Sequence, residues 1–214
     1  MRKNLTELVM ILDRSGSMRG MEKDTIGGYN SMLDKQKKEE GEAYVTTILF
    51  DDRTETIHDR VNLREVPEIT EKEYYVRGCT ALLDAVGSTI RHIETVHRYA
   101  REEDRPEKTI VIIITDGYEN ASRQFSLAQV KSMVSRQQEL GWEFLFLGAN
   151  IDAIAEAGKF GICAERAATY HSDSVGTELN YRVLSKTVSA MREGRAPIDA
   201  SWKDEIVEDY ESRK

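Results

Sequence analysis

The sequence predicts an α/β protein with a doubly wound, mostly parallel central sheet, one antiparallel edge strand and helices on both faces. Three short apolar runs, Leu8–Leu12, Thr109–Thr115 and Glu143–Leu147, alternate with amphipathic stretches of helical length. Strands that are apolar on both faces belong in a sheet covered by helices on both sides. Ala43–Phe50 and Thr54–Leu63, separated by three polar residues, predict a hairpin that places the antiparallel strand at an edge.

Apolar residues that recur every three or four positions predict the helices. The helix that opens at Ser126 starts with a capping box and ends at Gly141. The last long helix places Val175, Leu179, Val183 and Met191 on one face. The helices are expected over Met21–Lys38, Leu82–Ala100, Ser126–Gly141, Ala153–Phe160 and Val175–Met191.

The 214 residues are interpreted as a single domain, residues 1–214. Its core spans about residues 5–161, and residues 162–214 form a C-terminal strand and helix extension packed on the same domain. Trp202, Ile206 and Tyr210 are expected to face this body from a short amphipathic tail. Arg64–Gly78 has little periodicity and is expected to be a surface excursion, in which the acidic run Glu65–Glu73 forms a solvated face.

The composition, 40% hydrophobic and 32% charged, is that of a folded globular chain. A net charge of −8 argues against nucleic acid and anionic membrane as the main partner, because both attract positive patches. No run approaches the roughly 20 apolar residues that a membrane helix needs, and the N-terminal apolar run is too short for a signal peptide. Cys79 and Cys163 are too few for a disulfide framework, so a cytoplasmic location is expected.

Polar side chains follow two predicted core strands and precede a predicted helix. Asp13, Ser15 and Ser17 come directly after the first strand, Asp116 comes directly after Thr109–Thr115, and Thr80 precedes the Leu82–Ala100 helix. The carboxyl ends of parallel strands share one edge of a sheet, which is where doubly wound folds bind ligands. Two carboxylates and three hydroxyls are hard donors that suit Mg²⁺, Mn²⁺ or Ca²⁺ and not zinc. The five metal ligands expected are Asp13, Ser15, Ser17, Thr80 and Asp116.

An alternative explains the first three of these residues without a metal. Aspartate and serine are ordinary turn and N-cap residues, so Asp13, Ser15 and Ser17 could cap the Met21–Lys38 helix. The convergence of three separate loops on one sheet edge favours the metal site.

Four segments, ILDRSGSM, VTTILFDD, RGCTALLDAVGSTI and VIIITDG, resemble von Willebrand factor A-type (vWA) domains, most closely the stand-alone bacterial ones. The resemblance spans about Leu5 to Gly161 and implies the Rossmann-like vWA fold with a metal-ion-dependent adhesion site (MIDAS). It implies that Ser15, Ser17 and Thr80 are the hydroxyl ligands. The family often has Gly-Gly-Thr where this chain has Cys79 before the threonine, which changes the flexibility of the loop and removes no ligand.

In that family the aspartates often act through water, and an acidic residue of a partner protein fills the remaining octahedral position. The resemblance therefore implies that Asp13 and Asp116 supply charge, and that the partner supplies an Asp or Glu carboxylate. Arg14 and Arg77 would offset the repulsion between that carboxylate and a negatively charged chain. The other residues expected to flank the metal face, either selecting the partner or merely forming polar loops, are Tyr118, Glu119 and Asn120.

Two nearby features have ordinary explanations. Asp51 and Asp52 could form a second cation site, but aspartates in a hairpin are more often turn formers. Cys79 could be redox-sensitive, but a small buried thiol is the commoner outcome.

The function expected is a divalent-cation-dependent protein-binding module that is not an enzyme. The alternative is a metal-dependent phosphohydrolase, with Arg14 and Arg77 clamping a phosphate. Serines follow Asp13 where such enzymes need a second carboxylate, and the chain has no phosphate-binding G-x-x-x-x-G-K-[ST] motif. A dinucleotide-binding domain is excluded because no G-x-G-x-x-G follows the first strand.

Overall fold

In the computed structural model, which describes residues 1–194 and 199–213, six strands form one sheet in the order β3-β2-β1-β4-β5-β6. Every neighbouring pair is parallel except β2 and β3, which form the predicted hairpin at one edge. The predicted fold class is confirmed. The strands are β1 (Arg2–Asp13), β2 (Glu42–Phe50), β3 (Thr54–Asn62), β4 (Pro106–Thr115), β5 (Trp142–Ala149) and β6 (Ala167–Tyr170).

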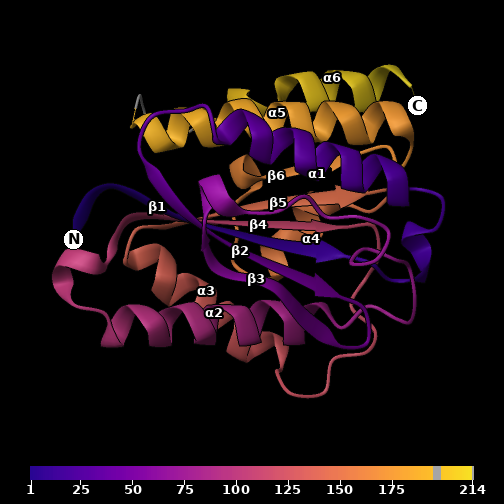
Figure 1. The fold of residues 1–214 in the computed structure, drawn as a ribbon. Coiled ribbons are helices and arrows are strands. Elements are labelled where there is room, and N and C mark those ends of the chain that lie inside the picture. The colour runs from indigo at the N-terminus through magenta and orange to yellow at the C-terminus, as the bar shows by residue number, and fades with distance from the viewer. Residues whose placement is uncertain (195–198, 214) are drawn as a thin grey trace.

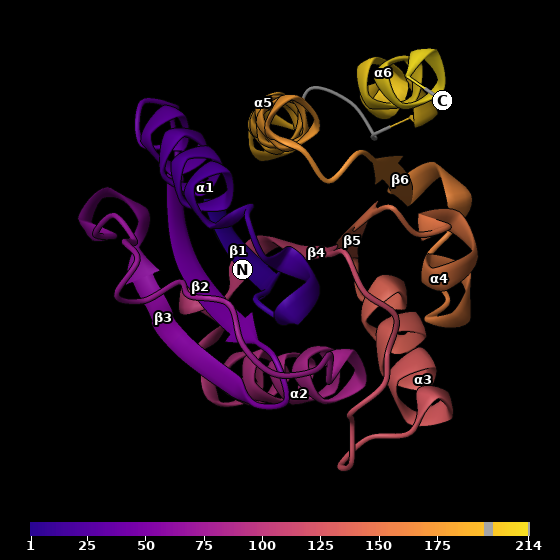
Figure 2. The ribbon, with the colours of Figure 1, turned by 90° about the vertical axis from the view of Figure 1, so that its right-hand side faces the viewer.

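Helices cover both faces of this sheet (Figures 1 and 2). One face packs against α1 and α5, and the other packs against α2, α3 and α4. In Figure 1 the strand β1 runs from left to right, so Figure 2 faces the edge at which β1 and its parallel neighbours end. The helices are α1 (Glu22–Gln36), α2 (Leu82–Tyr99), α3 (Leu127–Glu139), α4 (Ala153–Lys159), α5 (Ser174–Glu193) and α6 (Asp204–Ser212).

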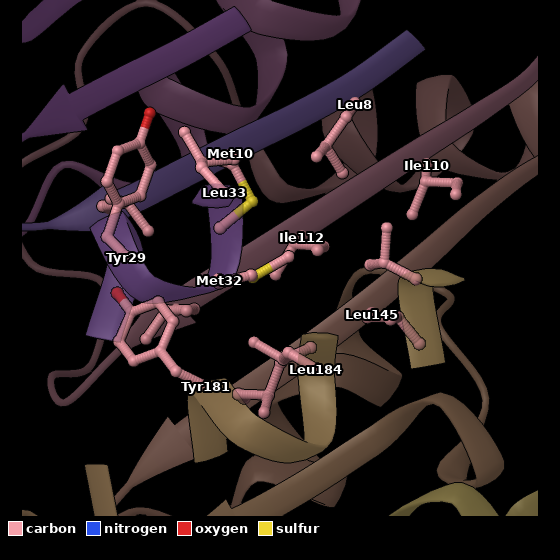
Figure 3. Close-up of a cluster of buried hydrophobic side chains, with 14 of the residues drawn as sticks. Leu8, Met10, Tyr29, Met32, Leu33, Ile110, Ile112, Leu145, Tyr181 and Leu184 are labelled. Atoms are coloured by element: carbon pink, nitrogen blue, oxygen red, sulfur yellow. The ribbon is translucent and has the colours of Figure 1, made fainter. Parts of the chain in front are cut away.

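The alternation of side chains along β1 builds both halves of the core. Leu8 and Met10 point to the α1 and α5 side, where they meet Met32 and Leu184 (Figure 3). Val9 packs in the cluster on the opposite side. Because β1 is buried on both faces, packing fixes its position in the sheet. The loop that follows Asp13 therefore begins at a defined point on the carboxyl edge.

The segment that joins β3 to α2 departs from the expectation of a surface excursion. Val66, Ile69 and Tyr74 are buried in the α1 and α5 side of the core, and Asn30 bonds both backbone polar groups of Ile69. The expectation was wrong because apolar residues three apart can anchor a segment that is neither helix nor strand. Glu65, Glu68 and Glu71 are exposed, as expected for a solvated face, and Glu73 is half-buried.

The C-terminal part contributes a strand and two helices. Ile206 of α6 is buried in the core and Trp202 packs against it, as the tail prediction required. Val175, which the sequence places on one face with Leu179, Val183 and Met191, is 60% exposed in the first turn of α5. The buried face of α5 instead presents Tyr181 and Leu184, among others, to the core. None of the helices in the described ranges is both long enough and apolar enough to cross a membrane.

Candidate metal centre

The five predicted ligands meet at the carboxyl edge of the sheet. Asp13 is the last residue of β1, and Asp116 follows the last residue of β4, the strand paired with β1. Ser15 and Ser17 lie in the loop after β1, where residues 16–18 form one 3₁₀ turn. Thr80 lies two residues before α2 and is buried.

Hydrogen bonds connect four of these residues to one another or to the adjacent Thr115. The four are Asp13, Ser15, Ser17 and Asp116. The Ser17 hydroxyl donates to Asp116 Oδ1 at 2.5 Å, and its oxygen lies 3.1 Å from Ser15 Oγ. Asp13 accepts from the Ser15 backbone N–H at 2.7 Å through Oδ1 and from the Thr115 hydroxyl at 2.5 Å through Oδ2. The loop after β1 is therefore tied to the ends of β1 and β4 through its side chains.

Thr80 joins the same cluster across Gly117. A Cβ added to Gly117 would lie 2.9 Å from Thr80 Oγ1 and 3.4 Å from Ser17 Oγ, so both hydroxyls lie against this glycine. A larger residue at position 117 would displace Thr80, since real Cβ contacts at 2.9 Å are essentially absent from proteins. Asn120 fixes Thr80 from the other side, because its side chain accepts from the Thr80 N–H and its own N–H donates to the Thr80 carbonyl.

The two carboxylates of this cluster are shielded from solvent to different degrees, because Asp13 is buried and Asp116 is half-buried. Burial raises the pKa of Asp13 from 3.8 to about 6, although Thr115 and Ser15 donate hydrogen bonds to it. Burial also raises the pKa of Asp116. Among residues 1–194 and 199–213, neither carboxylate forms an ion pair with a basic side chain. A cation bound beside them would lower both pKa values and remove this electrostatic cost.

The capping alternative is wrong for α1. This helix begins after Met21, and no side chain caps its first turn. Ser15 precedes the 3₁₀ turn and makes no side-chain capping bond there either. The polar atoms of Asp13 and Ser17 are directed instead toward β4 and Asp116. In the described ranges no three His, Cys, Asp or Glu residues gather as a metal cluster, so the donors at this edge are mainly hydroxyls.

Arg14 was expected near the face of the site and is instead fully buried. Its Nε donates to Asp51 at 2.9 Å and its Nη2 donates to Glu55 at 2.7 Å. A guanidinium with no exposed surface cannot clamp a phosphate or meet a partner, so that expectation was wrong. Asp51 does form the expected hairpin turn, because it accepts from the Arg53 N–H, but it is also the buried counterion of Arg14.

The structure also shows how Cys79, Glu119, Asn120 and Tyr118 lie in these loops. Cys79 is exposed, where a buried thiol was expected. Glu119 fits the alternative of a loop-forming residue, because its carboxylate accepts from the Leu83 and Ala121 N–H groups and from Ser122. The Asn120 side chain likewise accepts a hydrogen bond from a backbone N–H, that of Thr80. Tyr118, in contrast, is 52% exposed.

Asp84 is a structural residue that the sequence analysis missed. Its carboxylate accepts three backbone N–H bonds, from Arg123, Gln124 and Phe125, and so shapes the loop that follows Asp116. The available signal was an acidic residue in the first turn of α2, a position at which aspartate usually stabilises the helix end and seldom reaches another loop.

Comparisons with known proteins agree with this architecture. The family model of VWA domain containing CoxE-like proteins matches residues 1–144, which is more than half of the chain. The chain belongs to this family. Domains of this family are generally protein-interaction modules. No curated protein sequence matches this VWA chain.

Solved structures share the VWA fold at low identity. Proximal thread matrix protein 1 of the mussel byssus, with a zinc-occupied MIDAS motif, has a TM-score of 0.59 and 15% identity, covering 88% of this chain and 47% of its own. The manganese-loaded Plasmodium vivax TRAP protein has a TM-score of 0.58 and 15% identity, covering 84% and 73%. The von Willebrand factor type A protein of Catenulispora acidiphila has a TM-score of 0.59 and 14% identity, covering 86% and 42%. This chain thus spans about half the length of the byssus protein.

Proposed function

We propose that this VWA chain is a divalent-cation-dependent protein-binding module, with the cation at the carboxyl edge of the sheet. The observation that carries the proposal is a buried and a half-buried carboxylate, Asp13 and Asp116, beside three hydroxyls, with no basic side chain to neutralise them in the described ranges. The residues proposed to hold the cation are Asp13, Ser15, Ser17, Thr80 and Asp116.

The donor set suits Mg²⁺, with Mn²⁺ or Ca²⁺ as other candidates. Hydroxyls of Ser15, Ser17 and Thr80 would bind directly, and the two aspartates would act mostly through water. Two structures with this fold hold zinc or manganese, which supports a divalent ion and makes Zn²⁺ a necessary competitor in any titration.

A carboxylate of a partner protein would complete the coordination. With three hydroxyls and two aspartate-held waters around an octahedral ion, one position remains toward solvent. A carboxylate there makes a charge-assisted contact that a neutral ligand cannot match. The partner proposed is therefore a protein with an accessible Asp or Glu, and not nucleic acid or membrane.

The phosphohydrolase alternative has less support from the geometry. Asp13 is buried and both of its oxygens accept hydrogen bonds, from Ser15 and Thr115, which makes it a poorer nucleophile than an exposed carboxylate. The expected phosphate clamp loses one of its two arginines, because Arg14 is buried. We propose that the chain is not an enzyme, and that residues 1–214 act as one domain in the cytoplasm.

Calorimetric titration tests the metal site. Mg²⁺ and Mn²⁺ are expected to bind the unaltered chain and to lose measurable affinity in Asp13→Ala, while circular dichroism stays unchanged. Unaltered Mg²⁺ binding in that variant would exclude this site. A partner isolated in Mg²⁺ should be released by EDTA, and a partner whose affinity ignores both EDTA and Thr80→Ala would exclude the proposed contact.

A further inference from the structure

The two loops that carry the proposed hydroxyl ligands are held against each other through the hairpin of β2 and β3. Gly16, between Ser15 and Ser17, donates its N–H to the Gly78 carbonyl at 3.1 Å. The Arg77 N–H donates to the Arg14 carbonyl at 2.9 Å. These two backbone bonds join the loop after β1 to the loop that precedes Thr80.

A set of side chains reinforces the same junction, and we name Arg14, Asp51 and Arg77 the arginine brace. The Nε atoms of both arginines donate to one oxygen, Asp51 Oδ2, at 2.9 and 2.7 Å. Both guanidinium groups lie 5.2 Å from the centre of the Tyr75 ring, and Arg77 also donates to the Tyr75 hydroxyl at 3.1 Å. Asp51 thus connects an arginine of one loop to an arginine of the other.

The Asp51 carboxyl of the brace is held in its ionised form. Burial raises the pKa of Asp51, but hydrogen bonds with Arg77, Asp52, Arg53 and Arg14 outweigh that effect, so the pKa is lowered overall. Gly78 closes the junction with φ +68°, and a Cβ there would lie 2.8 Å from Asp52 Oδ1. The hairpin tip therefore fits closely against the loop that leads to Thr80.

We propose that the arginine brace sets the metal affinity by holding the Thr80 loop against the Ser15 and Ser17 loop, and that Arg77 is a positioning residue in it. This inference rests on the proposed function, because it concerns the same cation. A binding site whose ligands are already in place loses less conformational freedom on binding and so binds more tightly.

Positioning and simple electrostatics predict opposite effects at Arg77. Arg77 carries a positive charge near a dication, so removing that charge should tighten metal binding if Coulomb repulsion is its only effect. If Arg77 positions the loop, removing it should weaken binding. Added salt distinguishes the two explanations further. It screens the interaction between exposed charges, whereas it has little influence on how well the loop is ordered.

The experiment compares Arg77→Met with Arg53→Met by Mn²⁺ titration calorimetry at 50 and 500 mM salt. Both variants lose one positive charge from the same region, but the Arg53 side chain makes no hydrogen bond or ion pair in the described part of the chain. Arg77→Met is expected to weaken Mn²⁺ about five- to tenfold at both salt concentrations, and Arg53→Met to leave it unchanged or slightly tighter. Arg77→Lys should not restore the Mn²⁺ affinity. One ammonium group cannot bond both Asp51 and the Tyr75 hydroxyl with the geometry of the guanidinium fork.

Folding is checked separately, since Arg77 is 42% exposed and its loss should not unfold the chain. Metal-free hydrogen exchange at the Gly16 and Arg77 amides should rise about tenfold in Arg77→Met and not in Arg53→Met. Affinity that is equal or tighter in Arg77→Met, or unchanged exchange at these amides, would overturn the inference. Absence of Mn²⁺ binding to the unaltered chain would instead overturn the proposed function, and the brace's role in affinity with it.

Discussion

Asp13 ends β1 and Asp51 follows the last residue of the neighbouring strand β2, so both are buried aspartates at the same edge of the sheet, yet their surroundings are opposite. Asp51 meets two guanidinium groups, and its pKa is lowered. Asp13 meets a hydroxyl and a backbone N–H, and burial raises its pKa to about 6. Within the described ranges, basic side chains pair with the Asp51 carboxylate and none pairs with that of Asp13. This difference separates a residue that maintains the fold from one proposed to bind an external cation.

The largest effect is expected from Asp51→Asn. The change leaves Arg14 buried with only Glu55 as an anionic partner, and breaking a buried pair typically costs about 3–5 kcal/mol. Urea unfolding should show this loss at pH 7, and Asp52→Asn, at the exposed neighbouring position, is the matched control. Equal stability of the two variants would mean that the brace contributes nothing to the fold.

Asp13→Asn is expected to act in the opposite direction when no metal is present. The folded pKa of about 6 exceeds the unfolded 3.8, so the folded chain holds an extra proton between these values and stability falls as pH rises through them. The variant avoids this loss and should be more stable in EDTA by about 2–3 kcal/mol at pH 7.5. Unfolding in urea at pH 4 and 7.5 checks this, since the gap should close at pH 4.

Mg²⁺ should close that gap. A ligand at a hundredfold excess over its Kd stabilises the folded chain by about 2.7 kcal/mol, whereas Asp13→Asn should gain little. Thermal unfolding with Mg²⁺ or EDTA measures this for both proteins. Equal gains in the two would show that Mg²⁺ binds elsewhere.

A smaller effect is expected from Thr80→Ala. Loss of one hydroxyl ligand should weaken Mg²⁺ binding by about 1–2 kcal/mol, on the scale of one polar contact to an ion, and lower the free energy of unfolding in EDTA by about 0.5–1.5 kcal/mol, because Thr80 is buried and also loses a methyl group. Titration calorimetry and urea unfolding measure the two quantities. Thr89→Ala provides a control, because this buried hydroxyl donates only within α2.

The smallest effect is expected from Glu55→Gln. Its carboxylate binds Arg14, but its side chain is 48% exposed, so solvent screens the pair and about 0–1 kcal/mol should be lost. Urea unfolding at low and high salt checks this. A loss comparable to that of Asp51→Asn would show that Arg14 depends on both anions equally.

The positions at which the strands end explain why much of the candidate site, at the carboxyl edge of the sheet, could be predicted from the sequence. Buried apolar runs fix where β1 and β4 stop, and Asp13 and Asp116 follow at once, so their proximity follows from the order of the strands. Thr80 could be placed because it precedes a strongly amphipathic helix. That these residues bind a metal stays a prediction.

Long-range partners could not be predicted. The sequence gives the charge of Arg14 but not the anion that it meets, and Asp51 and Glu55 lie 37 and 41 residues away. The burial of Tyr74 and the exposure of Cys79 depend on how an irregular segment lies on the fold, and such segments carry no repeating pattern.

The exposed thiol beside Thr80 gives this edge of the molecule a natural attachment point for a reporter. Cys79 can carry a fluorophore or spin label without any change to the protein's sequence, and Cys163, which is also exposed, lies on a different loop after α4. Cys163→Ser would leave a single labelled position next to the proposed cation. Quenching of that label by paramagnetic Mn²⁺ would then report occupancy in real time, during partner capture and release alike.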